Sequence, residues 1–146
     1  MTPRYYELPI KFDLLMSRNV ELPLCDLKKS IAQNIYLIIT SRFRENRYDD
    51  SFGCELWDMD FELVHNESMW VERIRKSVLN SIINHETRIY SIYTDIQISQ
   101  EEKIFSLNKS MGVKKRLTIK VDCKIKETGE DYMFNTNIYL SPISLD

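Results

Sequence analysis

The feature that most constrains the fold of this chain is a change in the period of its hydrophobic pattern after His85. Before this residue, apolar side chains recur every three or four positions in two segments, as on one face of an amphipathic helix. After it, apolar and polar residues alternate, as in strands that bury one face. Two helices followed by strands predict an α+β domain in which both helices cover one face of a sheet.

The first helix is predicted to begin after Asp26 and to end near Phe43. The Asp26 carboxylate can accept hydrogen bonds from the free amides of a first turn, which makes it a suitable N-cap. The predicted buried face consists of Leu27, Ile31, Ile35, Ile38 and Ile39. Residues 44–53 follow neither period and end on Gly53, so they are expected to form a loop.

The second helix is predicted over residues 66–85, with Asn66 as its N-cap. Its apolar stripe repeats every four residues and consists of Trp70, Ile74, Val78 and Ile82. Met69, Val71 and Ile83 widen this stripe, and we expect the two helices to pack together.

Three strands are expected after the helices, in a mostly antiparallel sheet. The buried face of the first strand is predicted to be Tyr90, Ile92, Thr94, Ile96 and Ile98. That of the second is Leu117, Ile119, Val121, Cys123 and Ile125. That of the third is Tyr132, Phe134, Thr136, Ile138 and Leu140. The last two strands, residues 115–126 and 131–140, are expected to form a hairpin in which Gly129 supplies the positive φ of the turn.

Residues 1–25 are irregular and hold three of the four prolines in the chain. They predict an extended N-terminal arm with one short strand. The remaining residues, 26–146, are expected to form a single domain, since a chain of 146 residues with 43% hydrophobic residues suits one buried core.

Composition and charge argue against several classes of function. A net charge of −2 does not favour a nucleic-acid partner, because phosphate binding needs clustered positive charge. The three cysteines form no Cys-x-x-Cys pair and indicate reduced thiols in the cytoplasm rather than disulfides or a zinc site. No apolar stretch is long enough for a membrane span, so direct membrane contact is not expected.

Catalytic motifs are not recognisable in the sequence. The three glycines are too scattered for a phosphate loop, so no nucleotide cofactor is predicted. His85-Glu86 begins like a metalloprotease helix, but Ile89 stands where the second histidine is needed, so no metal is predicted. We interpret His85 as a helix-end residue and His65 as part of a loop. The sequence therefore predicts no enzyme and no catalytic residues.

One enzymatic alternative depends on acidic residues between the helices. These residues are Asp49, Asp50, Glu55, Asp58 and Asp60. Two carboxylates at a fixed separation can cleave a glycosidic bond, as in a lysozyme-type glycosidase. A solvated acidic loop explains the same residues more simply and is the favoured interpretation.

The junction Asn84-His85-Glu86-Thr87-Arg88 lies where the second helix is expected to end and the first strand to begin. Glu86 and Arg88 are two positions apart and can point to one side of such a junction. They could form a fork of hydrogen-bonding groups for a partner protein. A local salt bridge is the alternative, and it is the simpler reading of the two residues alone.

The order of these motifs resembles the baseplate wedge family of contractile phage tails and type VI secretion systems, which is sometimes labelled lysozyme-like. The resemblance covers residues 30–140 and includes Thr40-Ser41-Arg42 after the first helix, Phe52-Gly53 after the loop, and Leu79-x-x-Ile82-x-x-x-Glu86-x-Arg88 at the junction. The family usually has Glu-Pro-Arg at this junction, so Thr87 replaces the proline. It also usually has a Pro-Gly-rich loop where this chain has residues 43–47.

The resemblance implies a structural baseplate component with no cofactor. Its implied partners are two larger wedge subunits and the sheath, in a sixfold cytoplasmic assembly near the inner membrane. The residues implied for wedge docking are Glu86, Arg88 and Arg42. Asn135 and Asn137 are the residues expected to lie on the sheet edge that binds the sheath, because a three-stranded sheet has two edges that can pair with another chain. An unrelated heteromeric adaptor is a further alternative.

Overall fold

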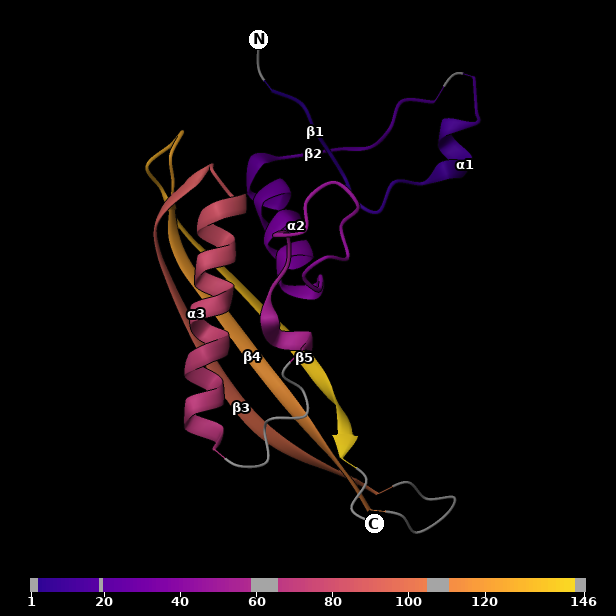
Figure 1. The fold of residues 1–146 in the computed structure, drawn as a ribbon. Coiled ribbons are helices and arrows are strands. Elements are labelled where there is room, and N and C mark those ends of the chain that lie inside the picture. Colours follow the sequence, from indigo (N-terminus) through magenta and orange to yellow (C-terminus); the bar gives the residue numbers. More distant parts are fainter. Residues whose placement is uncertain (1–2, 19, 59–65, 105–110, 144–146) are drawn as a thin grey trace.

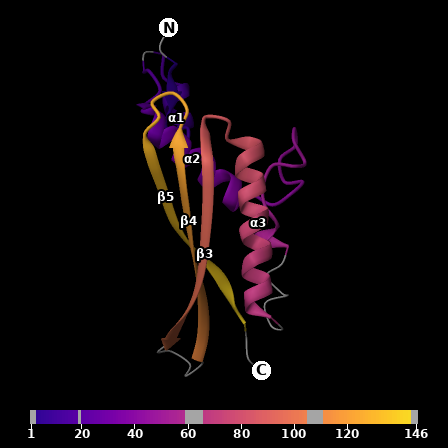
Figure 2. The ribbon, with the colours of Figure 1, turned by 90° about the vertical axis from the view of Figure 1, so that its left-hand side faces the viewer.

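The computed structural model describes residues 3–18, 20–58, 66–104 and 111–143. Three long antiparallel strands, β3 (Ile89–Ile104), β4 (Met111–Ile125) and β5 (Asp131–Ile143), form a sheet in the order β3-β4-β5. Two helices, α2 (Leu27–Thr40) and α3 (Glu67–His85), pack beside this sheet (Figure 1). The strands twist strongly along their length, as Figure 2 shows. The predicted α+β class is confirmed.

Both helices begin where the sequence predicts. The Asp26 carboxylate accepts a hydrogen bond of 2.7 Å from the Lys29 amide, and the Asn66 side chain caps α3 in the same way. However, α2 ends at Thr40 instead of near Phe43. The reason is long-range, because the chain turns into an extended conformation at Ser41 and then forms an isolated bridge with the segment around Cys54.

The core lies between the two helices and the inner face of the sheet. The helices bury Ile31, Ile35, Ile38, Ile39, Trp70, Ile74, Val78 and Ile82. The central strand β4 buries Leu117, Ile119, Val121, Cys123 and Ile125. All of these residues were predicted to face inward. The core is therefore continuous from α2 across to the central strand.

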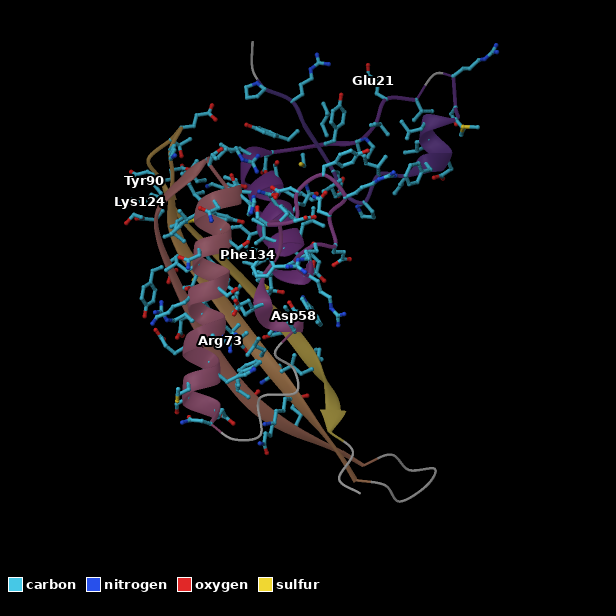
Figure 3. The ribbon with its side chains drawn as sticks, in the orientation of Figure 1. Glu21, Asp58, Arg73, Tyr90, Lys124 and Phe134 are labelled. Atoms are coloured by element: carbon cyan, nitrogen blue, oxygen red, sulfur yellow. The ribbon has the colours of Figure 1, made fainter. Side chains whose placement is uncertain are left out.

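The inner face of β3 differs from the predicted one at its first residues. Tyr90 is 43% exposed and points away from the helices (Figure 3), while Ile89 is buried in its place. The cause is a β-bulge, in which Ser91 and Ile92 together oppose the single residue Cys123 on β4. One extra residue reverses the phase of the alternation, and Ser91 adopts a positive φ of 52° there. The prediction that Tyr90 belongs to the buried face is wrong.

The N-terminal arm contains more structure than the single predicted strand. Two short strands, β1 (Tyr5–Tyr6) and β2 (Leu24–Cys25), pair antiparallel, and a helical turn, α1 (Phe12–Leu15), lies between them. The pairing brings both ends of the arm back to α2, so the arm is a closed loop. Figure 1 shows α1 projecting away from the sheet.

The loop after α2 packs closely against the ends of both helices. A short 3₁₀ helix, η1 (Glu55–Trp57), which was not predicted, follows Gly53. The Trp57 indole donates a hydrogen bond of 3.0 Å to the Ile39 carbonyl, and the Ser81 hydroxyl donates to the Gly53 carbonyl. No helix among the described residues is long and apolar enough to cross a membrane.

Gly53 lies where the structure leaves no room for a side chain. Its φ is +124°, and a Cβ there would lie 2.6 Å from the Ser41 carbonyl oxygen. We expect Gly53→Ala to lower the free energy of unfolding by about 2–5 kcal/mol, through backbone strain and steric overlap together. Chemical denaturation monitored by circular dichroism measures this effect.

The matched control is Gly129→Ala in the hairpin turn. Gly129 also has a positive φ, of 71°, but a Cβ there meets nothing within 4 Å. Gly129→Ala should lower the free energy of unfolding by only about 1–2 kcal/mol. Equal losses for the two variants would show that close packing at Gly53 is unimportant.

Candidate functional site

The junction between α3 and β3 holds the only fully buried acidic side chain among the described residues, Glu86, which is 1% exposed. Glu86 ends α3 with an extended backbone conformation. Its carboxylate accepts two hydrogen bonds from the Arg88 guanidinium, of 2.8 and 2.7 Å, and a third from the Arg88 amide of 3.0 Å. The two residues thus form a bidentate pair with little geometric freedom.

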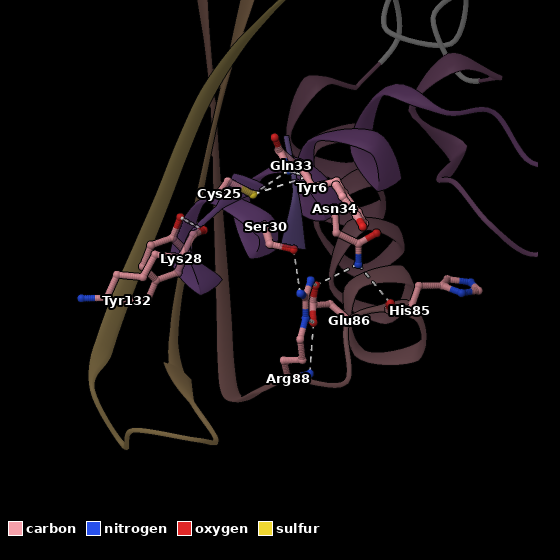
Figure 4. Close-up of polar contacts among 10 residues, drawn as sticks. All are labelled: Tyr6, Cys25, Lys28, Ser30, Gln33, Asn34, His85, Glu86, Arg88 and Tyr132. Carbon is pink, nitrogen blue, oxygen red and sulfur yellow. Dashed lines mark hydrogen bonds and ion pairs between the residues drawn. The ribbon is translucent and has the colours of Figure 1, made fainter. Parts of the chain in front are cut away.

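The helix α2 completes this site from the other side, as Figure 4 shows. The Asn34 amide donates hydrogen bonds of 2.8 Å to the Glu86 carboxylate and 3.2 Å to the His85 carbonyl. The Arg88 guanidinium donates a hydrogen bond of 2.8 Å to the Ser30 hydroxyl. The pair therefore links α2, the end of α3 and the start of β3.

Both members of the pair are held in their charged forms. Burial alone would raise the pKa of Glu86, but hydrogen bonds from Arg88 and Asn34 outweigh it and hold this pKa below its ordinary value of 4.5. The hydrogen bond to Glu86 raises the pKa of Arg88 further. The site at neutral pH is therefore a satisfied ion pair rather than a proton donor or acceptor.

The N-terminal arm lies against this pair. The guanidinium carbon of Arg88 is 5.3 Å from the centre of the Tyr5 ring, within the range of a cation–π interaction. A cavity of about 420 Å³ opens beside the pair, between the arm, α2 and the junction. Its lining includes Leu8, Leu37 and Thr87 together with the charged pair Glu86 and Arg88.

The structure brings together two of the three residues that the resemblance implied for wedge docking. Arg42 is exposed and lies beyond the end of α2, whereas Ser30, which contacts Arg88, lies in the first turn of that helix. The helix between them spans about 15 Å at 1.5 Å per residue. The local salt bridge of Glu86 and Arg88 is observed. Their docking role and that of Arg42 stay predictions.

Sequence reasoning missed the three side chains that surround this pair, namely Ser30, Asn34 and Tyr5. Ser30 and Asn34 are four residues apart on α2, so they lie on one side of the helix next to its apolar stripe. Two short polar residues at this spacing beside a buried face are a signal that a partner group lies opposite them. Nothing in the local pattern around Tyr5 indicates its contact with Arg88.

The predicted sheath-binding residues lie on the outer face of β5, an edge strand of the described sheet. The Ile125 amide donates a hydrogen bond to the Glu130 carbonyl. In an antiparallel pair every second residue bonds to the neighbouring strand, so the even-numbered residues of β5 from Tyr132 to Ile138 bond to β4. By this alternation, the backbone amides of Asn135 and Asn137 point away from β4. A strand of another chain could therefore form hydrogen bonds with these two amides.

Two of the acidic residues between the helices, Asp49 and Glu55, form local side-chain contacts. Asp49 accepts hydrogen bonds from the Ser51 hydroxyl and amide, which hold its pKa below its usual range. Glu55 pairs with Arg73 at 3.2 Å. A glycosidase acid needs the opposite shift, a raised pKa. Asp60 of this group and His65 lie outside the described residues.

His85, at the end of α3, packs against the loop that follows α2. Its ring lies 5.2 Å from the Phe52 ring, and its Nε2 atom is 3.1 Å from the Ser51 carbonyl oxygen. These contacts match the predicted helix-end position. Within the described residues, no cluster of three or more His, Cys, Asp or Glu side chains is arranged to hold a metal ion.

Comparison with known proteins identifies related sequences and folds. The sequence model of the family described as baseplate wedge protein gp25 matches residues 25–130, which include the whole junction. A crystal structure at 1.44 Å of a Geobacter sulfurreducens protein, described provisionally as a tail lysozyme, superposes with a TM-score of 0.56 at 19% identity. It covers 83% of this chain and 97% of its own, and at this identity it supports the fold alone. No curated protein matches the sequence significantly.

The buried pair predicts how stability depends on pH. The pKa of Glu86 is lower in the folded state than in the unfolded state. The ionised carboxylate therefore stabilises the fold at pH values above the unfolded-state pKa, and this stabilisation is lost as the pH falls through the folded-state pKa. We expect Glu86→Gln to cost about 3 kcal/mol at pH 7. The difference from wild type should shrink as the pH falls below 4.5, measured by thermal melting.

The control for this experiment is Glu127→Gln, which changes an exposed carboxylate in the hairpin turn. Its melting temperature should follow that of wild type at every pH. A Glu86→Gln deficit that stays constant from pH 7 to pH 3 would contradict the assignment of a charged Glu86.

Proposed function

Because this chain belongs to the baseplate wedge protein gp25 family, we propose that it is a structural component of the baseplate in a type VI secretion system or a related contractile injection system. In this proposal it binds the larger wedge subunits, takes part in a sixfold cytoplasmic assembly near the inner membrane, and templates the first sheath subunits. The observation that supports this proposal most is that the family match spans both helices, the junction, β3 and β4, and ends just before β5.

We propose that Arg88 is the residue that contacts a wedge subunit and that Glu86 positions it. The Arg88 side chain is 28% exposed, whereas Glu86 is covered. The guanidinium is held by two bonds to the Glu86 carboxylate and one to the Ser30 hydroxyl, so its exposed part is fixed in position, which lowers the entropy cost of binding. Arg42 would serve as a second contact, at the other end of α2.

The proposed sheath contact is strand addition to the edge of β5. An added strand gains main-chain hydrogen bonds along the edge, and alternate side chains set its register. The outward side chains around this edge include Asn135 and Asn137, and Asn137 accepts a hydrogen bond of 2.9 Å from Thr118. Polar side chains there keep the unpaired strand compatible with water until a partner strand binds.

We propose that the protein has no enzymatic activity. The glycosidase alternative needs one carboxyl group with a raised pKa and a second at a fixed distance across a sugar-sized cleft. Asp49 has a lowered pKa, and Glu55 forms an ion pair with Arg73. The arrangement of these acids therefore supports loop stabilisation more than glycoside hydrolysis.

Arg88→Ala should abolish co-purification of the protein with its wedge subunits. Loss of one charged member of an interface pair costs about 2–5 kcal/mol of binding free energy. The measurement is affinity purification of the tagged protein, followed by mass spectrometry of the proteins that bind to it.

Arg88→Lys separates docking from folding in this experiment. The lysine keeps a positive charge beside Glu86, so the fold should persist, but it lacks the planar fork of arginine. It should also fail to recover the wedge subunits. Normal recovery by variants that fold as well as wild type would show that Arg88 acts only within the protein.

Asn135→Pro should allow wedge binding but prevent sheath assembly. Proline removes the backbone amide that points away from β4 and leaves the buried face of β5 unchanged. Fluorescence microscopy of labelled baseplate and sheath should then show baseplates without sheaths. Asn135→Ala is the matched control, because it removes the same side chain and keeps the amide. Normal sheaths from the proline variant would exclude this edge as the template.

A further inference from the structure

The exposed face of α1 is its apolar face, which is the reverse of the usual arrangement. Phe12, Leu15 and Met16 are 76%, 52% and 87% exposed, at helical spacings of three and four residues. Leu14 points in the other direction and is half-buried. Contiguous apolar groups on the surface of a folded protein indicate a binding site.

The base of the arm holds this turn in place. The Leu8 amide donates a hydrogen bond of 2.8 Å to the Gln33 side chain. The Gln33 side chain in turn donates to the Tyr6 carbonyl at 3.2 Å (Figure 4). Glu7 forms an ion pair with Lys29. These contacts fix residues 6–8 on α2, so α1 projects from a fixed base and less conformational entropy is lost when it binds.

We propose that the apolar finger, defined as Phe12, Leu15 and Met16, inserts into an apolar groove on one of the larger wedge subunits. The spacing of the three side chains fits the helix-in-groove mode of recognition. The inference rests on the proposed function, because it adds a second contact to the same docking surface. The finger lies outside residues 25–130, so it is separate from the part of the chain matched by the family.

The position of the arm identifies the wedge subunit as the partner. Tyr5 at the base of the arm lies over the Arg88 guanidinium, and Tyr6 and Leu8 line the cavity beside Glu86. A protein that contacts Arg88 therefore meets the arm as well. The finger extends this surface outward, away from the sheet (Figure 1).

The charges near the finger favour a protein partner over a lipid surface. Residues 10–22 carry two basic side chains, Lys11 and Arg18, and two acidic ones, Asp13 and Glu21. Helices that bind anionic membranes have an excess of Lys and Arg beside their apolar face. A balanced charge and a helix of four residues give little affinity for lipid.

The direct experiment compares the affinity of the full chain and of a triple variant, Phe12→Ser with Leu15→Ser and Met16→Ser, for purified larger wedge subunits from the same organism. Biolayer interferometry should show binding at least about 30-fold weaker for the variant, as for the loss of an interface hot spot. The melting temperature should not change, because all three side chains are exposed. Met16→Asp alone, at the most exposed of the three positions, should weaken binding in the same direction.

The control is Tyr48→Ser, which removes an exposed aromatic side chain from the loop after α2 and should bind as wild type does. If the folded triple variant binds with wild-type affinity, the proposed insertion of the apolar finger is wrong, and the proposed function is not affected. A wild-type protein that does not bind the wedge subunits would contradict the proposed function itself. Binding of wild type, but not of the triple variant, to phosphatidylglycerol vesicles, with wedge affinity unchanged, would replace the protein groove by a lipid surface.

Discussion

The hydrogen-bonded pair of Glu86 and Arg88 determines how the helices meet the sheet. A buried charge without a partner is costly, so Glu86 is compatible with this fold only while Arg88 and Asn34 bond to it. Arg88 directly precedes β3 and Asn34 lies on α2, while Glu86 itself is the C-cap of α3. The pair thus links these three elements, while 28% of the Arg88 side chain stays exposed to solvent.

The bulge in β3 follows directly from this arrangement. The chain must leave α3, place Arg88 beside Glu86, and bury Ile89 against the core within a few residues. The side chain of Tyr90 then faces outward. Regular alternation from Ile89 would turn Tyr93 and Asp95 toward the core further along the strand. The extra residue at Ser91 and Ile92 restores the phase, so that Thr94 and the apolar residues after it face the helices.

Sequence reasoning predicted those parts of the fold that depend on local pattern. The caps at Asp26 and Asn66, the helix stripes and the hairpin turn at Gly129 are encoded within a few residues of where they act. The errors arise where the local structure depends on contacts with residues far away in the sequence. The end of α2 depends on the bridge to Cys54, the phase of β3 depends on a bulge opposite β4, and the surroundings of Glu86 depend on a helix some fifty positions earlier in the chain. The pairing of β1 with β2 is hidden for the same reason.

The strand β4 separates the two proposed contact surfaces by a fixed distance. The Lys126 amide bonds to the Arg88 carbonyl at one end, and Asn135 and Asn137 lie opposite Lys120 and Thr118 further along the sheet. At about 3.4 Å per residue, the docking pair and the sheath-facing residues are about 20–27 Å apart. In the proposed assembly, a wedge subunit at the junction and a sheath strand on the edge of β5 would therefore contact different parts of the sheet. Because β4 is bonded to both β3 and β5, docking through Arg88 in the proposed assembly would fix the position of the β5 edge relative to the wedge subunit.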